Sequence, residues 1–179
     1  MTGADKGSST QGSGGLAPRS FEPWYRDEFP RVVRALFLIG RDRDLAIDAA
    51  SEAFARALER WGQVSVMASP TGWTYTVGLN VLRRTLRRRH LEGRLIRRHA
   101  QPHTLSLDSQ VELWDALSRL PLRERTAVVL HYFLDLRQDE VARMMGVAPG
   151  TVAAALHSAR AKLRTVVGLE LETGRGDDA

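Results

Sequence analysis

The chain has 179 residues, 43% of them hydrophobic, and a formal net charge of +5. This length fits one domain or two small ones. It contains no cysteine, which excludes disulfides, cysteine-based zinc sites and thiol catalysis and is compatible with a reducing cytoplasm. No apolar run approaches the roughly 20 residues of a membrane span, and the Gly/Ser-rich start lacks a signal-peptide core. We therefore expect a cytoplasmic protein without membrane insertion, with a disordered tail over residues 1–20 and a second tail over residues 169–179.

Two amphipathic helices are predicted in the first third of the chain. The first covers about residues 22–39, with Pro30 as a kink or a start and Gly40 as its stop. The second covers about residues 44–61. Its buried stripe consists of Ile47, Ala50, Phe54, either Ala57 or Leu58, and Trp61.

A second face of the helix over residues 44–61 is acidic. Its carboxylates are those of Asp44, Asp48, Glu52 and Glu59. Periodicity alone favours an interpretation in which these residues complement the helix dipole and keep the surface soluble. The alternative is a docking face for a basic partner.

After a loop over residues 62–68, a long helix is predicted over residues 69–98. Ser69 is a candidate N-cap, and Pro70 is suited to the first helical position. One face repeats apolar side chains and should be buried: Tyr75, Leu79, Leu82 and Leu86. The opposite face runs from an aromatic through an amide into arginines: Trp73, Val77, Asn80, Arg84, Arg87 and Arg88.

Positive charge is concentrated in the same segment. Residues 83–99 contain eight arginines and one glutamate, and they account for the net charge of the whole chain. Aromatic and amide groups beside a basic run suit unstacked bases and a phosphate backbone. The segment therefore indicates a nucleic-acid surface, with a solvated helix end as the weaker alternative.

A linker over residues 99–107 precedes a second helical unit over residues 108–168. The linker holds two histidines without a carboxylate or cysteine cluster, so no metal site is expected. Helices are predicted over about residues 108–119, 123–134 and 138–145, and from residue 149 onward. Small, turn and core residues stand where a helix-turn-helix needs them: Ala142, Gly146, Val147, Val152 and Leu156. An ordinary helical hairpin is the alternative.

Together the two units resemble a sigma-70 family RNA polymerase sigma factor of the extracytoplasmic-function (ECF) type. The resemblance spans roughly residues 21–168 and rests on three motifs. AIDAASEAF is similar to the helix that binds core polymerase, and SPTGWTYTVGLNVLRR resembles the segment that melts the −10 element. LSRLPLRERTAVVLHYFLDLRQDEVARMMGVAPGTV resembles the region that reads the −35 element.

The resemblance implies an all-α fold of two small domains, over residues 21–98 and 108–168, joined by a flexible linker. It implies as partners core RNA polymerase (its beta-prime clamp and beta flap), promoter DNA and a candidate anti-sigma factor. The implied polymerase contacts are Asp48, Ser51 and Glu52. The implied −10 contacts are Trp73, Tyr75, Asn80, Arg83, Arg84, Arg87 and Arg88, aided by the loop over residues 62–68. The implied −35 contacts are Thr151, Ala153, Ala154, His157, Ser158, Arg160 and Lys162, with Arg164 as a further candidate.

The chain departs from the family pattern at two places. Ser51 stands where glutamine is usual, which predicts a weaker polymerase contact. The recognition helix reads Thr151-Val152-Ala153-Ala154-Ala155-Leu156, where the family commonly has T-V-K-S-R-L. Alanine can touch a thymine methyl but cannot make a bidentate contact to guanine, each of which contributes roughly 1–3 kcal/mol of discrimination. We therefore predict weak or altered reading of the −35 element.

Two rival functions remain open at this point. One is a stand-alone helix-turn-helix regulator that binds duplex DNA without polymerase. The other is a diverged adaptor whose second unit binds protein. The sequence shows no convergent acid–base pair, phosphate loop or metal motif, so neither an enzyme nor a bound cofactor is expected.

Overall fold

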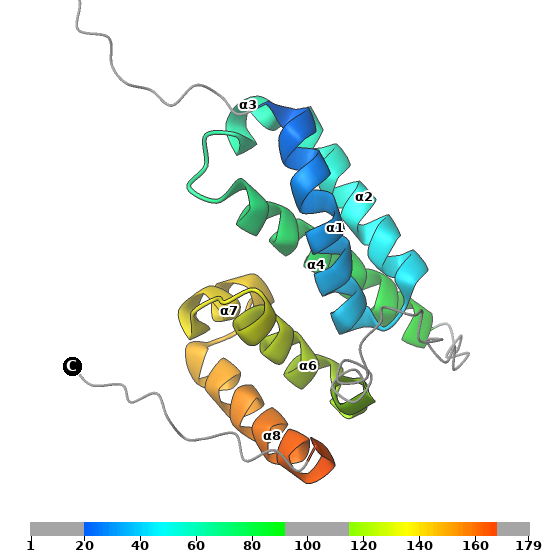
Figure 1. Ribbon diagram of the computed structural model, residues 1–179, viewed down its shortest axis with the longest axis vertical. Coiled ribbons are helices and arrows are strands. Elements are labelled where there is room, and N and C mark those ends of the chain that lie inside the picture. Colours follow the sequence, from blue (N-terminus) through cyan, green and yellow to red (C-terminus); the bar gives the residue numbers. More distant parts are fainter. Residues whose placement is uncertain (1–19, 92–114, 168–179) are drawn as a thin grey trace, which may run out of the picture.

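The computed structural model describes residues 20–91 and 115–167, and within these ranges all regular structure is helical (Figure 1). Residues 115–119 are helical. The other elements are α1 (Phe21–Gly40), α2 (Arg43–Glu59), α3 (Trp61–Val64), α4 (Pro70–Leu91), α6 (Leu122–Val128), η1 (Val129–Phe133), α7 (Gln138–Met145) and α8 (Pro149–Val167). The predicted all-α class is confirmed. Residues 1–19, 92–114 and 168–179 lie outside the described ranges, and with them the predicted linker and both predicted tails apart from Ser20.

The first unit is formed by α1, α2 and α4, which pack on one another (Figure 1). Pro30 lies inside α1 without ending it. The turn to α2 is short because Arg41 adopts a left-handed conformation (φ 60°) and Asp42 caps α2, accepting a hydrogen bond of 3.0 Å from the Leu45 N–H. Ala57 is buried and Leu58 is exposed, so Ala57 is the residue that belongs to the buried stripe of α2.

A short helix, α3, occupies part of the predicted loop over residues 62–68, so that prediction was wrong over residues 62–64. Helix α2 ends at Glu59, two residues earlier than predicted. Trp61 then begins α3, and its ring lies 4.7 Å from that of Trp24 and 5.2 Å from that of Phe21, centroid to centroid. This aromatic packing holds the chain in a compact turn where composition alone indicated a loop.

Helix α4 begins as predicted. The Ser69 hydroxyl accepts a 3.0 Å hydrogen bond from the Gly72 N–H, which is an N-cap contact. Leu79 and Leu82 are buried against α1 and α2, and Gly78 lets α4 approach them closely. An added Cβ at Gly78 would lie 3.0 Å from Leu36 Cδ1. One face of α4 is therefore packed against two neighbouring helices, and the opposite face points outward.

The second unit contains α6, η1, α7 and α8. The predicted helix over residues 123–134 exists, but its second half is the π-helical segment η1, which the sequence did not indicate. Helix α7 has the bounds that were predicted. Gly146 ends α7 in the left-handed conformation (φ 65°), as the turn of a helix-turn-helix requires, and Val152 and Leu156 are buried behind it.

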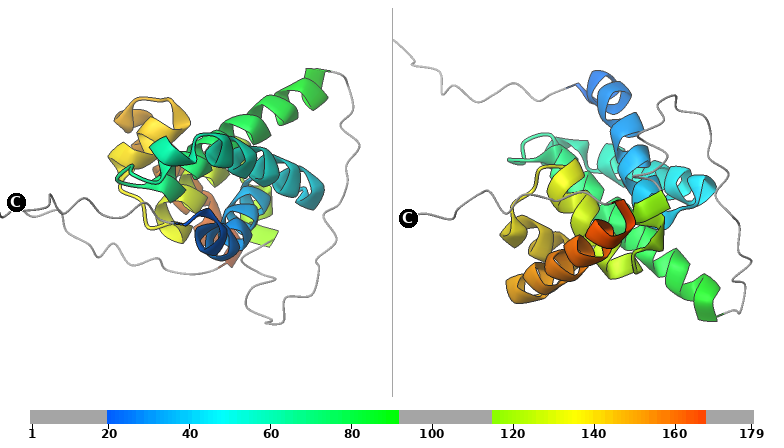
Figure 2. Two further views of the ribbon diagram at one scale, coloured as in Figure 1. Left: turned by 90° about the horizontal axis from the view of Figure 1, so that it is seen from above. Right: turned by 60° about the horizontal axis from the view of Figure 1, so that its bottom comes forward.

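The two units are in contact. Helix α1 packs against α6 and η1, and α4 touches α7. The three views agree that the lower end of α1 lies beside α6 (Figures 1 and 2). The buried apolar side chains accordingly form one continuous cluster that runs through both units.

Candidate nucleic-acid interface

The acidic face of α2 lies on the surface. Asp48, Ser51 and Glu52, the three residues predicted to contact polymerase, are all exposed. Glu52 Oε1 lies 2.8 Å from Arg56 Nη2, one helical turn away. Both side chains are about half exposed, so this ion pair contributes at most about 1 kcal/mol and can be exchanged for another basic partner.

The residues near the start of α4 that were predicted to contact the −10 element differ in their exposure. Trp73 is half-buried against the core, while Asn80 is exposed two turns further on. Tyr75 is only 8% exposed, and burial raises the pKa of its hydroxyl to about 12. The structure thus places Tyr75 with the buried face of α4, and in this arrangement it offers DNA almost no surface.

The arginines of α4 fall into two groups. Arg84, Arg87 and Arg88 are exposed and follow Asn80 along the helix. Arg83 is half-buried, and its Nη1 donates a 2.8 Å hydrogen bond to the main-chain carbonyl of Met145 at the end of α7. We define the α4 ridge as Asn80, Arg84, Arg87 and Arg88. This ridge is an outward strip of one amide and three cations, and amide and guanidinium groups suit bases and phosphates, respectively.

Arg89 is turned away from the ridge. Its Nη1 lies 2.9 Å from Asp42 Oδ2, the carboxylate that caps α2. This ion pair ties the second half of α4 to the start of α2. Arg89 therefore stabilises the packing of the first unit. In the sequence it is part of the same basic run as the arginines of the ridge.

The outer face of α8 is poor in polar groups. Ala153, Ala154 and His157 are exposed, and Thr151 is half-buried. Ala155, which the sequence comparison treated as a lost DNA-facing position, is only 7% exposed and belongs to the core. That expectation is corrected: two alanines, not three, stand where polar side chains could have faced DNA.

Glu124 of α6 engages two of the predicted −35 contacts. Its Oε1 accepts hydrogen bonds of 3.0 Å from the Ser158 hydroxyl and 2.6 Å from Lys162 Nζ. Arg160 is half-buried, and its Nε has no hydrogen-bond partner among the described residues. Sequence reasoning missed Glu124, because a contact across 34 to 38 residues carries no local signal.

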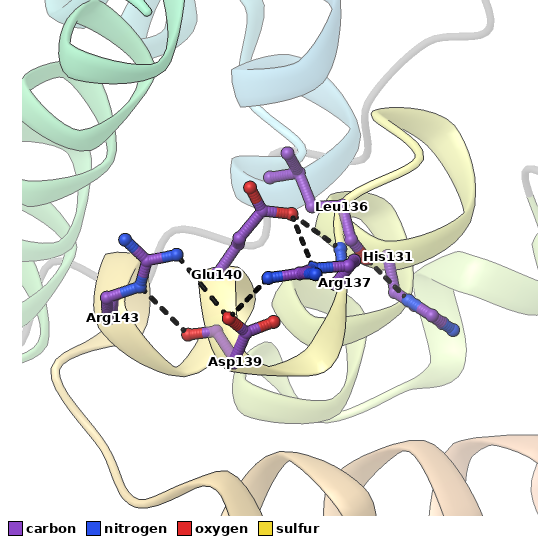
Figure 3. A network of polar contacts seen from close by, with 6 residues as sticks. All are labelled: His131, Leu136, Arg137, Asp139, Glu140 and Arg143. Atoms are coloured by element: carbon purple, nitrogen blue, oxygen red, sulfur yellow. Dashed lines mark hydrogen bonds and ion pairs between the residues drawn. The ribbon is translucent and has the colours of Figure 1, made fainter. Parts of the chain in front are cut away.

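The start of α7 carries a polar network (Figure 3). Asp139 Oδ2 lies 3.0 Å from Arg137 Nη2 and 3.5 Å from Arg143 Nη2. Desolvation raises the pKa of the Asp139 carboxyl, but the hydrogen bond and charge of Arg137, a backbone hydrogen bond and the charge of Arg143 together outweigh it, so the pKa lies below its usual range. Just before α7, His131 Nδ1 donates a 2.7 Å hydrogen bond to the Leu136 carbonyl, which ties η1 to the chain entering α7. The i, i+4 spacing of Asp139 and Arg143 was visible in the sequence but was not used.

Within residues 20–91 and 115–167, no group of three histidine, aspartate or glutamate side chains could hold a metal ion. The two histidines considered for metal binding lie outside those ranges. Among the described helices, none combines the length and the apolar character that a membrane span requires.

A basic helical ridge together with a helix-turn-helix defines a DNA-binding protein. Residues 24–92 match the family model for Sigma-70 region 2, and residues 110–163 match that for Sigma-70, region 4. These matches cover more than half of the chain, which belongs to the sigma-70 family of RNA polymerase sigma factors.

Curated relatives narrow this to the ECF type. The chain is 28% identical over 158 residues to the ECF RNA polymerase sigma factor SigM of Mycobacterium tuberculosis, covering 87% of this chain and 80% of that protein. It is 30% identical over 132 residues to the RNA polymerase sigma-E factor of Streptomyces antibioticus, covering 72% and 71%. The chain is an ECF sigma factor, and it directs promoter-specific initiation of transcription.

Solved structures agree on the fold. The sigma factor RpoE of Bartonella quintana, in complex with the anti-sigma factor NepR, superposes with a TM-score of 0.70 at 20% identity. That match covers 84% of this chain and 98% of RpoE. CnrH, in complex with the cytosolic domain of CnrY, gives a TM-score of 0.57 at 19% identity and covers 84% and 88%.

Proposed function

We propose that the first unit binds core RNA polymerase through α2 and melts the −10 element through α4, and that the second unit reads the −35 element weakly or in an altered way through α8. The observation that carries this proposal is the α4 ridge: one exposed amide followed by three exposed arginines, on a helix whose other face is packed against α1 and α2. A rigid helix can hold a separated strand in a fixed register.

The energetics of strand opening suit this surface. Extruding a base from a duplex costs a few kcal/mol, which stacking, hydrogen bonds and phosphate contacts must offset. Trp73 and Asn80 stand where a base would be held, and Arg84, Arg87 and Arg88 extend along the path of the backbone. Arg83 is proposed as a further backbone contact, and Tyr75 would have to leave the core before it could take part.

The polymerase contact is assigned to Asp48, Ser51 and Glu52 on α2. Their exposure and the surrounding negative charge support docking on a basic surface. The beta-prime clamp is the proposed partner for this face, and the beta flap is the proposed partner for the second unit. The protein would then act in the cytoplasm with the polymerase, without catalytic activity or a cofactor of its own.

The proposal for the −35 element follows from α8. With Ala153 and Ala154 exposed, and with Ser158 and Lys162 bound to Glu124, few groups are available to read base edges. His157 and Arg164 are exposed, and His157 is the stronger candidate for a base contact because it lies within the recognition segment. Promoter choice would then depend mainly on the −10 element, on a T-rich −35 sequence or on an accessory protein.

An anti-sigma factor is a further proposed partner, of the kind that NepR is for RpoE. The test of the whole proposal is run-off transcription from genomic fragments with core polymerase, followed by mapping of the start sites. Initiation at a small set of promoters with a shared −10 element supports it. A protein that binds duplex DNA tightly without polymerase would favour a stand-alone regulator.

The adaptor alternative is tested by substituting Arg160 and Lys162 together. If the second unit binds protein instead of DNA, transcription that depends on polymerase should be unchanged in that variant. A loss of promoter selectivity supports DNA reading by α8.

A further inference from the structure

A carboxylate of α6 reaches across to the recognition helix α8, which packs beside it. Glu124 lies in the first turn of α6, and its Oε1 accepts hydrogen bonds from Ser158 Oγ at 3.0 Å and from Lys162 Nζ at 2.6 Å. Ser158 and Lys162 are one helical turn apart and therefore lie on the same face of α8. The family resemblance implied a −35 contact for both. One carboxylate thus holds two predicted DNA contacts at once.

The Glu124 carboxylate is largely removed from water. Its side chain is 14% exposed, against 47% for Lys162, and its Oε2 is buried without a hydrogen-bond partner among the described residues. Within the same residues, Lys162 is the one cation paired with it. If Lys162 moved to a DNA phosphate, a poorly solvated carboxylate would keep only the Ser158 hydroxyl as a partner, which is unfavourable. This penalty opposes the phosphate contact.

The pair also presents little positive charge to DNA. Lys162 Nζ and the Glu124 carboxylate carry opposite charges 2.6 Å apart, so together they are neutral. A phosphate oxygen in hydrogen-bond contact with Lys162 Nζ would lie within about 6 Å of Glu124 Oε1, and the two anions would repel each other. The Ser158 hydroxyl has a single proton, and while it donates that proton to Glu124 it cannot donate to a phosphate.

We propose that Glu124 limits binding of the −35 element by keeping Lys162 and Ser158 from the phosphates of the DNA. This inference rests on the proposed function, in which α8 faces the −35 duplex. Weak −35 reading then has two physical sources in this chain. Ala153 and Ala154 remove contacts to base edges, which carry sequence information, and Glu124 removes contacts to the backbone, which add affinity for every sequence.

The test uses holoenzymes assembled from core polymerase and the full chain. Glu124→Gln removes the charge and keeps an acceptor oxygen at the same position. The matched control is Asp115→Asn, which removes the same charge from the same unit and also takes a carboxylate out of a 2.6 Å ion pair, here with Arg119 on its own helix. Lys162→Gln, alone and combined with Glu124→Gln, completes a double-mutant cycle.

Affinity is measured on two promoter fragments, a long one that includes the −35 duplex and a short one that ends between the −35 and −10 elements. On the long fragment, Glu124→Gln should bind several-fold more tightly than the unsubstituted chain and the control. Its slope of log affinity against log salt should steepen by roughly 0.9, the value for one more phosphate contact. On the short fragment all variants should bind equally.

The lysine substitution shows whether Glu124 acts through Lys162. Lys162→Gln alone should change affinity for the long fragment by less than about twofold, whereas in the Glu124→Gln background it should remove most of the gain. Thermal unfolding monitored by circular dichroism verifies that the variants are folded. Because Lys162 is exposed, its single substitution decides the matter even if Glu124→Gln proves unstable.

Two results would overturn the inference, and they differ in what they say of α8. If Lys162→Gln alone weakens binding of the long fragment as much as it does in the Glu124→Gln background, Lys162 reaches a phosphate despite Glu124; the inference fails and DNA contact by α8 stands. If no variant changes the affinity and both fragments bind equally, α8 does not contact DNA, so the proposed function of the second unit fails together with the inference.

Discussion

Replacing Gly78 by alanine tests how closely α4 must approach its neighbours to carry the α4 ridge. The new Cβ would lie 3.0 Å from Leu36 Cδ1, which is closer than ordinary van der Waals contact. Leu36 is only 1% exposed, so its side chain has little room to move. Overpacking of this kind costs about 1–3 kcal/mol, whereas alanine gains about 0.5–1 kcal/mol over glycine in a helix interior. The expected net effect is a loss of about 1 kcal/mol in the free energy of unfolding.

Urea unfolding monitored by circular dichroism measures this change, and Gly62→Ala is the matched control. Gly62 lies in α3, in the same unit, and an added Cβ there meets nothing within 4 Å. The control should be neutral or slightly stabilising. If Gly78→Ala proved as stable as Gly62→Ala, the close approach of α4 to α1 would not constrain the first unit.

Four further predictions concern exposed residues of α2, α4 and α8 and the buried Tyr75. Asp48→Arg should abolish co-purification with core polymerase while thermal unfolding is unchanged; normal co-purification would remove α2 from the proposed interface. Arg84→Ala with Arg88→Ala should reduce the slope of log affinity against log salt by about 1.4 to 1.8 for the holoenzyme on a promoter, and an unchanged slope would mean that neither arginine contacts a phosphate. Ala154→Arg should raise discrimination at one −35 base pair by about 1–3 kcal/mol in competition binding; no change across all −35 variants would place α8 away from the base edges. Tyr75→Phe should flatten the fall in unfolding free energy between pH 10 and 12, because the raised pKa of Tyr75 adds stability that is complete below pH 10 and disappears as pH rises toward 12.

Much of the fold was predictable because its signals are local. Apolar periodicity located α1, α2 and α4, the Ser69 cap is present, and α7 has the predicted bounds. Two short segments, α3 and η1, were not predicted. Helix α3 exists because the Trp61 ring packs on residues of α1, and η1 departs from the α-helical pattern without any marker in its sequence.

The site was predictable to the extent that it follows one helix face. The order of exposure along α4 agrees with the expected front for Asn80, Arg84, Arg87 and Arg88. Tyr75 was assigned by periodicity to the buried face and by resemblance to DNA, and the structure places it with the buried face.

The pairings between distant residues were not predictable. Arg83 with Met145 and Arg125 with Ile39 join positions 62 and 86 residues apart. One sequence contains no period that links such positions, and arginine on a helix surface is compatible with solvent, a carbonyl or a phosphate. The packing of α1 against α6 brings Arg125 to Ile39, and the contact of α4 with α7 brings Arg83 to Met145.

The most direct test of the central claim is the affinity of the full chain for a labelled promoter fragment, measured with and without core RNA polymerase. We predict weak, non-selective binding by the chain alone and tight, −10-dependent binding once polymerase is added. Tight binding of the duplex by the chain alone, unchanged by polymerase, would contradict it.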